Sequence, residues 1–127
     1  MVTTTRIIVG AKDFNPSVYG TLPIDRAAAE GDLYKVKRMH KKNEGCTKAA
    51  MDSAATNGHF EIVKFLHENR TEGCSTDAMD FAAMNGHSEI VKFLAENRTE
   101  GCLDAMDLAT ENGHLNLAEW LYEQQMF

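Results

Sequence analysis

Hydrophobic residues in the central part of the chain recur with a helical period. In residues 59–69 they stand three and four positions apart, which places them on one face of an α-helix. The preceding segment, residues 50–57, is rich in alanine and predicts a short helix that a neighbouring backbone can approach closely. Nothing in this pattern alternates with a period of two, so we expect no β-sheet in it. The apolar stripe of the second helix consists of Ile62, Val63, Phe65 and Leu66.

The same helix pair recurs along the sequence. Residues 50–77 read AMDSAATNGHFEIVKFLHENRTEGCSTD, residues 78–104 read AMDFAAMNGHSEIVKFLAENRTEGCLD, and residues 105–123 read AMDLATENGHLNLAEWLYE. A more diverged copy occupies residues 24–46. A helix pair of this size cannot bury its apolar face alone, and stacked neighbours share one core. The repeat therefore predicts a solenoid.

Helix starts and stops are marked within each unit. The first helix should end at Asn-Gly, because glycine adopts the left-handed conformation without steric cost. We expect Asp77 and Asp104 to cap first helices, and Pro23 to occupy a first helical position. Asp32 in the first unit should begin the second helix. The equivalent residues in the other units are His59, His87 and His114, which we interpret as a ladder of turn-capping imidazoles.

The repeated segments of the sequence resemble a known protein family. The run AAxNGHxEIVKFL, at 54–66 and 82–94, resembles the most regular part of the ankyrin repeat, and Gly-Cys at 73–74 and 101–102 is similar to that family's Gly-Ala closing pair. The resemblance covers about residues 21–123 and implies a protein-interaction scaffold without catalysis. The period of 27 or 28 residues is shorter than the family's, which is about 33. The residues of the projecting β-hairpin are missing, which leaves the helical faces as the expected contact surface.

The fold class that follows is all-α, an α-solenoid of about four stacked helix-turn-helix ankyrin-like repeats. Residues 1–20 match no repeat and form a separate arm, expected to lie on the first unit or to dock something else. Lys35 and Arg38 replace Ile62 and Phe65, as a polar terminal cap requires. The last unit is either an ordinary cap or the contact with another chain. The repeat domain spans 21–127, with units at about 21–48, 49–76, 77–103 and 104–127.

The first helices carry the candidate partner-binding residues. On each of three helices two residues spaced i,i+3 share a face and are not needed for packing. Phe81, Met84 and Leu108 would form an apolar patch, of a kind that suits a partner surface. The alternative is that these side chains simply pack between adjacent helices. The full set is Ser53, Thr56, Phe81, Met84, Leu108 and Glu111.

Residues that could carry chemistry recur once per repeat and are interpreted as structural. One cysteine per unit is too widely spaced for a disulfide or a zinc site, and replaces a small buried alanine. Asp52 and Asp80 are expected to serve as caps or surface charges, and His40 and His67 to be exposed. GxxxxGK[ST], CxxC and GxSxG are absent. We therefore expect no enzyme activity, no cofactor and no metal. The cysteines are Cys46, Cys74 and Cys102.

The charge and the composition of the chain disfavour nucleic-acid binding and membrane insertion and indicate a cellular location. The net charge of −6 disfavours nucleic-acid binding, and no apolar run approaches the roughly 20 residues of a membrane helix. Without a secretory signal, a cytoplasmic location with reduced thiols is expected. Residues 1–63 carry +2 and residues 64–127 carry −8, so the stack should be an electrostatic dipole.

The sequence thus predicts a scaffold that binds a protein or peptide, of unknown identity, on the concave face of the stack. We expect a monomer. The alternative is a structural or self-associating terminal fragment of a larger repeat protein. It would associate weakly through the C-terminal helix, with Trp120, Tyr122 and Phe127 exposed.

Overall fold

Four helix pairs make up the described chain. The computed structural model describes residues 22–124, and no strand occurs in that range, so the all-α prediction is confirmed. The predicted arm at residues 1–20 lies outside the described residues, as does Phe127, and the division into domains stays a prediction. The pairs are α3 (Pro23–Glu30) with α4 (Leu33–Lys41), α5 (Lys48–Thr56) with α6 (Phe60–Asn69), α7 (Thr76–Met84) with α8 (Ser88–Asn97), and α9 (Ala105–Glu111) with α10 (Leu115–Glu123).

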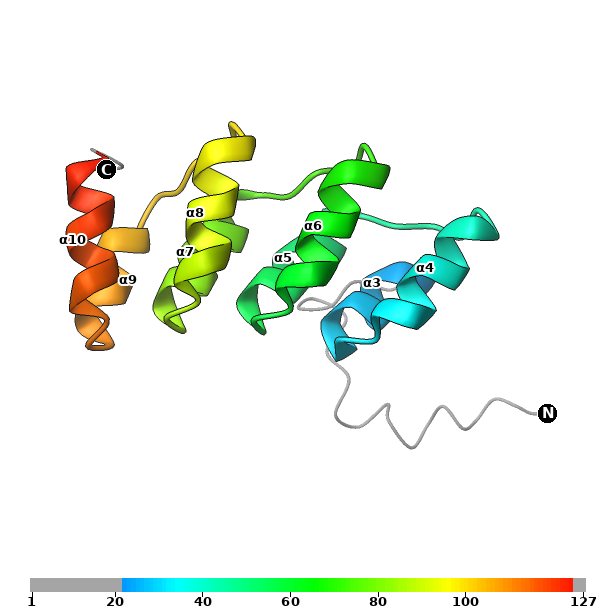
Figure 1. Cartoon of the computed structure of the whole chain (residues 1–127), viewed down its shortest axis with the longest axis horizontal. Helices are drawn as coiled ribbons and strands as arrows, with labels where there is room; N and C mark the ends of the chain where they lie inside the picture. The colour runs from blue at the N-terminus through cyan, green and yellow to red at the C-terminus, as the bar shows by residue number, and fades with distance from the viewer. Residues whose placement is uncertain (1–21, 125–127) are drawn as a thin grey trace.

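The helices form two layers. The first helices of the pairs, α3, α5, α7 and α9, lie side by side in one layer, and the second helices lie in front of them (Figure 1). Contacts between neighbouring first helices are far more extensive than those between neighbouring second helices. Small side chains explain the difference, because the first helices face one another through fully buried alanines such as Ala54, Ala55, Ala82 and Ala83.

One apolar core runs through all four pairs. Each first helix contributes alanines and, in the first three pairs, one larger buried residue (Ile24, Met51, Met79), while each second helix contributes a stripe that points inward. In α6 the residues Ile62 and Leu66 are buried at 2% and 1% exposure. Because no pair closes its own core, burial of this apolar surface depends on the neighbouring pairs.

The turn inside each pair is made by glycine. Gly31, Gly58, Gly86 and Gly113 all have φ between +75° and +82°, the left-handed region in which an L side chain is strained. The residue that follows each glycine donates its backbone N–H to a carbonyl of the first helix, as His59 does to Ala54 over 2.9 Å. This is the helix stop that the Asn-Gly pattern predicts.

The N-caps differ in part from the prediction. Pro23 does occupy the first turn of α3, and Asp32 does cap α4 by accepting from the Lys35 N–H at 3.0 Å. The prediction for Asp77 was wrong, because the Ser75 hydroxyl caps α7 and accepts from the Asp77 N–H at 3.1 Å. Asp104 stands at the N-cap of α9 but makes no side-chain capping bond.

Candidate partner-binding surface

The predicted contact residues lie on the layer of first helices. Phe81 and Leu108 occupy the same repeat position on α7 and α9, which pack against each other, and Met84 follows Phe81 by one helical turn. The structure therefore places these three side chains on the same face of two neighbouring helices. Phe81 is 37% exposed, Met84 and Leu108 are half-buried, and Glu111 is exposed.

Two predicted residues contribute less than expected. Ser53 occupies the repeat position of Phe81, yet it is only 2% exposed, so its side chain is not accessible to a partner. Its small size lets the neighbouring helices cover it, whereas an aromatic ring at that position extends beyond them. Thr56 is half-buried, and its hydroxyl donates to the Asp52 carbonyl at 2.8 Å. The accessible part of the surface therefore lies on α7 and α9.

Acidic side chains surround this surface. Asp77 on α7 and Asp104, Asp107 and Glu111 at or on α9 are all exposed. Residues 103–124 contain no lysine or arginine to neutralise the three that lie at or on α9. The local potential is therefore negative around an apolar centre, an arrangement that favours a partner carrying apolar and basic side chains.

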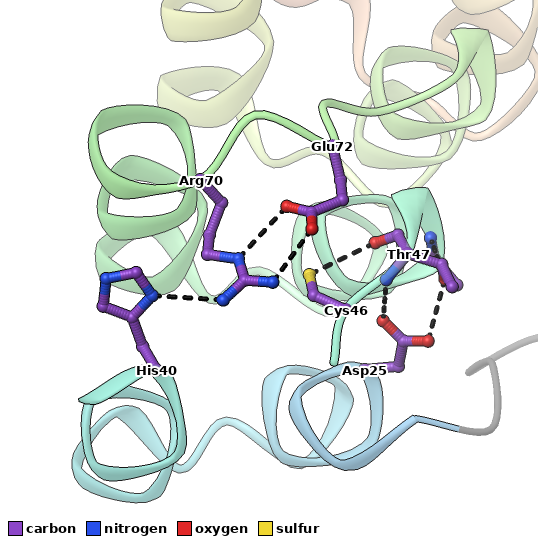
Figure 2. Close-up of polar contacts among 7 residues, drawn as sticks. Asp25, His40, Cys46, Thr47, Arg70 and Glu72 are labelled. Carbon is purple, nitrogen blue, oxygen red and sulfur yellow. Dashed lines mark hydrogen bonds and ion pairs between the residues drawn. The ribbon is translucent and has the colours of Figure 1, made fainter. Parts of the chain in front are cut away.

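A ladder of carboxylates joins each unit to the next. Asp25, which is completely buried, accepts from the Thr47 N–H at 2.7 Å and from the Thr47 hydroxyl at 2.8 Å (Figure 2). Asp52 accepts from the N–H and hydroxyl of Ser75 at 2.8 and 2.7 Å. Asp80, 5% exposed, accepts from the two N–H groups of Leu103 and Asp104, at 3.0 Å each.

Two of these carboxylates, Asp52 and Asp80, were misread from the sequence as caps or surface charges. Burial raises the pKa of Asp52 and Asp80, although the donors of the next unit act in the opposite direction. One sequence signal does exist. An Asp follows a large apolar residue of the first helix in every unit, and Asp25 and Asp52 have a Thr or Ser 22 or 23 residues later.

The histidines after each Asn-Gly turn have another role than the predicted capping. His59, His87 and His114 do stand at N-cap positions, but none makes a side-chain capping bond. Each ring instead covers the turn glycine of the preceding unit. A Cβ atom added to Gly31 would lie 2.6 Å from Cε1 of His59, and one added to Gly58 would lie 2.7 Å from Cε1 of His87. The imidazoles are therefore contacts between units.

A second polar contact joins the loops to the second helices. Arg70 donates to both carboxylate oxygens of Glu72, at 3.1 and 2.9 Å, and its Nη1 lies 3.2 Å from Nδ1 of His40 in the preceding unit (Figure 2). Arg98, Glu100 and His67 repeat the arrangement one unit later. His40 and His67 are thus half-buried rather than exposed as predicted. The Arg98 guanidinium holds the pKa of Glu100 down at about 2.

The cysteines are sheltered thiols. Cys74 is 2% exposed, and Cys46 and Cys102 are half-buried, so the prediction of a small buried residue is met fully only at Cys74. Burial raises the pKa of Cys46 and Cys74 to about 12, far from a reactive thiolate. In the part of the chain that the structure describes, no three His, Cys, Asp or Glu residues gather as a metal site.

Comparison with known proteins identifies the family to which the chain belongs. The family model of ankyrin repeats, built of three copies, matches residues 24–103 and again residues 54–126. The chain belongs to the ankyrin repeat family, as its sequence resemblance implies. Members of this family are in general protein–protein interaction modules and are typically not enzymes. A search of curated proteins found no match. Within residues 22–124 the helices are too short or too polar for any to span a bilayer.

Proposed function

We propose that the chain is a scaffold that binds a protein or peptide on the layer of first helices, the concave face of the stack. Phe81, Met84 and Leu108 are the apolar anchors, and the surrounding carboxylates orient the partner. The observation that carries this proposal is the exposure of Phe81. An aromatic side chain stands 37% exposed in a layer whose helices face one another through buried alanines, although a small residue such as Ser53 satisfies the same packing position.

The remaining polar groups support a role without chemistry of its own. The Asp ladder, the His–Gly contacts and the Arg–Glu–His contacts all join one unit to the next. The cysteine thiols are held protonated by burial. A stack that commits these groups to its own assembly presents a rigid surface, and a preorganised surface loses little entropy when a partner binds.

The test begins with a partner captured by the intact chain and identified by mass spectrometry. Its affinity is then measured by calorimetry for the wild type and for a variant with Phe81, Met84 and Leu108 all changed to Ala. We expect the dissociation constant to rise at least about tenfold, as for truncation of interface anchors. The same circular dichroism spectrum in both proteins would show that the stack remains folded.

A matched control separates this surface from apolar exposure in general. Tyr34 on α4 is 72% exposed and belongs to the layer of second helices. Tyr34→Ala should leave the affinity unchanged. If the triple variant binds like the wild type, or if Tyr34→Ala weakens binding as much, the proposed surface is wrong.

A further inference from the structure

Leu103 departs from the pattern of the position that precedes each first helix. In the third unit this position holds Ser75, whose N–H and hydroxyl both donate to Asp52, and Thr47 has the same role in the second unit. Leu103 has the equivalent place in the fourth unit, but it has no hydroxyl, and its N–H donates to Asp80 at 3.0 Å. Its side chain is 73% exposed. The fold alone would be served as well by a small polar residue here.

Phe81 is the same kind of exception on the neighbouring helix. It stands 37% exposed at the position where α5 has the covered Ser53. The bond from Leu103 to Asp80 holds the start of α9 against α7, and Asp80 directly precedes Phe81. Two exposed apolar side chains thus replace small polar residues on the same two packed helices. Apolar residues exposed on one part of a surface indicate a contact site, whereas scattered ones do not.

Aromatic residues on the second helices already have contacts within the stack. Tyr34 on α4 is exposed, but the Arg38 guanidinium lies 5.9 Å from the centroid of its ring. Trp120 on α10 has Nζ of Lys92 5.5 Å from its centroid and is half-buried, so it is not the exposed residue that the sequence suggested. Tyr122, on the same helix, also has an interaction partner. The apolar surface of α7 and α9 is therefore the stronger candidate for contact with another molecule.

The charge of this surface limits what can bind to it. Asp77, Asp104, Asp107 and Glu111 are exposed, and no ion pair within residues 22–124 involves any of them. A partner with Lys or Arg beside its apolar residues would neutralise these carboxylates, and a partner with acidic flanks would be repelled. The chemistry of the surface therefore favours a basic segment.

Side-chain donors on this part of the layer are already engaged. The hydroxyls of Thr56 and Thr110 and the amides of Asn85 and Asn112 each donate to a backbone carbonyl of the stack. Ionised carboxylates only accept hydrogen bonds. An extended peptide has backbone carbonyls that need donors, and these would stay unpaired if they were buried here. An α-helix pairs its own backbone groups, so it can lie on this surface without that cost.

The spacing of the anchors also fits a helix. Phe81 and Leu108 have equivalent positions on packed neighbouring helices, and the axes of such helices lie about 8–10 Å apart. Side chains spaced i,i+7 on an α-helix share a face and stand about 10.5 Å apart. Side chains on one face of an extended strand stand about 7 or 13 Å apart, which fits less well. A helix that crosses α7 and α9 thus places one apolar residue against each.

We propose that this surface takes a basic amphipathic helix, with Leu103 as a further anchor beside Phe81, Met84 and Leu108. The inference rests on the proposed function and names the class of its partner. Apolar residues at i, i+3 or i+4, and i+7 of the partner contact the four anchors, and Lys or Arg on its flanks pair with the carboxylates. A short segment of this kind is only partly helical in water and completes its helix on binding.

The test is selection of random peptides of about 16 residues, displayed on phage, against the immobilised intact chain. We expect the enriched sequences to carry the apolar i, i+3 or i+4, i+7 pattern with Lys or Arg beside it. A synthetic peptide of an enriched sequence should gain helical circular dichroism when it binds, because a helix of this length is marginal in water. Its dissociation constant is measured by calorimetry.

Two variants test the residues of the surface. Leu103→Ser restores the side chain that the third unit has at this position, so stability in urea should not fall, while the dissociation constant should rise about three- to tenfold. Asp107→Lys with Glu111→Lys should raise it at least about tenfold. Glu119→Lys with Glu123→Lys makes the same change of charge on exposed residues of α10, in the other layer, and should raise it less than about threefold.

The possible failures are distinguishable. Enriched peptides that are acidic, or that bind without becoming helical, overturn the inference, but the proposed function stands if changing Phe81, Met84 and Leu108 to Ala weakens them. Enriched peptides that are insensitive to this triple variant refute the proposed function as well. The inference is also wrong if no peptide is enriched, if Leu103→Ser binds like the wild type, or if the α10 control weakens binding as much as the α9 variant does.

Discussion

The carboxylate ladder makes a sharp prediction about stability, because the same residue occurs in every unit with different surroundings. Asp52 accepts two hydrogen bonds from Ser75, at 2.8 and 2.7 Å, and so fixes the start of α7 on α5. Asp107 has the same position in the fourth unit and is exposed, and no further unit follows it within residues 22–124. Changing each to Ala compares a carboxylate that joins two units with one that does not.

The expected magnitude follows from the contacts. A hydrogen bond to a charged group contributes about 1.5–3 kcal/mol, and Asp52 accepts two. Part of this is offset because the variant no longer buries a carboxylate, and because Ser75 is half-buried, so water can reach its donors. We therefore expect Asp52→Ala to lower the free energy of unfolding by about 2–3 kcal/mol. Asp107→Ala should change it by less than about 0.5 kcal/mol, as for an ordinary surface residue.

The assay is urea unfolding at neutral pH, followed by circular dichroism. Both variants should keep the helical signal of the wild type in the absence of urea. Equal losses of stability in the two variants would refute the reasoning, because the effect would then come from helix α5 or α9 alone. A neutral Asp52→Ala would refute it as well, since the bonds to Ser75 would contribute nothing net.

Three further predictions follow from the contacts between units. Gly58→Ala should lower the free energy of unfolding in urea by about 1–2 kcal/mol more than Gly113→Ala does. Both variants place a side chain at a positive φ, but only the new Cβ at position 58 would meet the His87 ring. Equal losses of stability in the two variants would contradict this. The pKa of Glu100 is lowered to about 2 in the folded chain. Ionised Glu100 therefore stabilises the fold at pH values above its ordinary pKa, and this stabilisation is lost as the pH falls from about 5 toward 2. Glu100→Gln should remove about 1 kcal/mol of that acid dependence in unfolding curves, and an unchanged profile would count against the ion pair. Burial raises the pKa of Cys74 to about 12, so little of this thiol is ionised at pH 8 in the folded chain. Its reaction with a thiol reagent at pH 8 should therefore be slower in the folded chain than in the urea-unfolded chain, on the order of a thousandfold. Equal reaction rates would refute the burial of Cys74.

Much of the fold could be predicted from the sequence, because its determinants are local and repeated. The stripe that includes Ile62 and Leu66 has a helical period, and the glycine of each Asn-Gly stop needs only its own backbone geometry. The contacts between units could not be predicted in the same way. Asp52 meets Ser75 across a gap of 23 residues, and nothing in either residue alone distinguishes a buried acceptor from a surface charge.

The candidate surface shows the same limit. Periodicity places Ser53 and Phe81 at one repeat position, but only their sizes decide that the first is covered and the second remains partly exposed. Likewise the histidines were expected to cap helices, since the sequence shows their spacing from Asn-Gly but not the glycine of the preceding unit beneath each ring. The sequence was informative about elements and less so about what each side chain contacts.

The central claim about the fold is that the first helices form one continuous layer whose stability comes from neighbouring units. Native-state hydrogen exchange, resolved by residue with NMR, tests it most directly. The account predicts that amides of α5 and α7, with a unit on either side, exchange most slowly, and that amides of α10 exchange faster. Protection that is uniform along the chain, or greatest in α10, would contradict it.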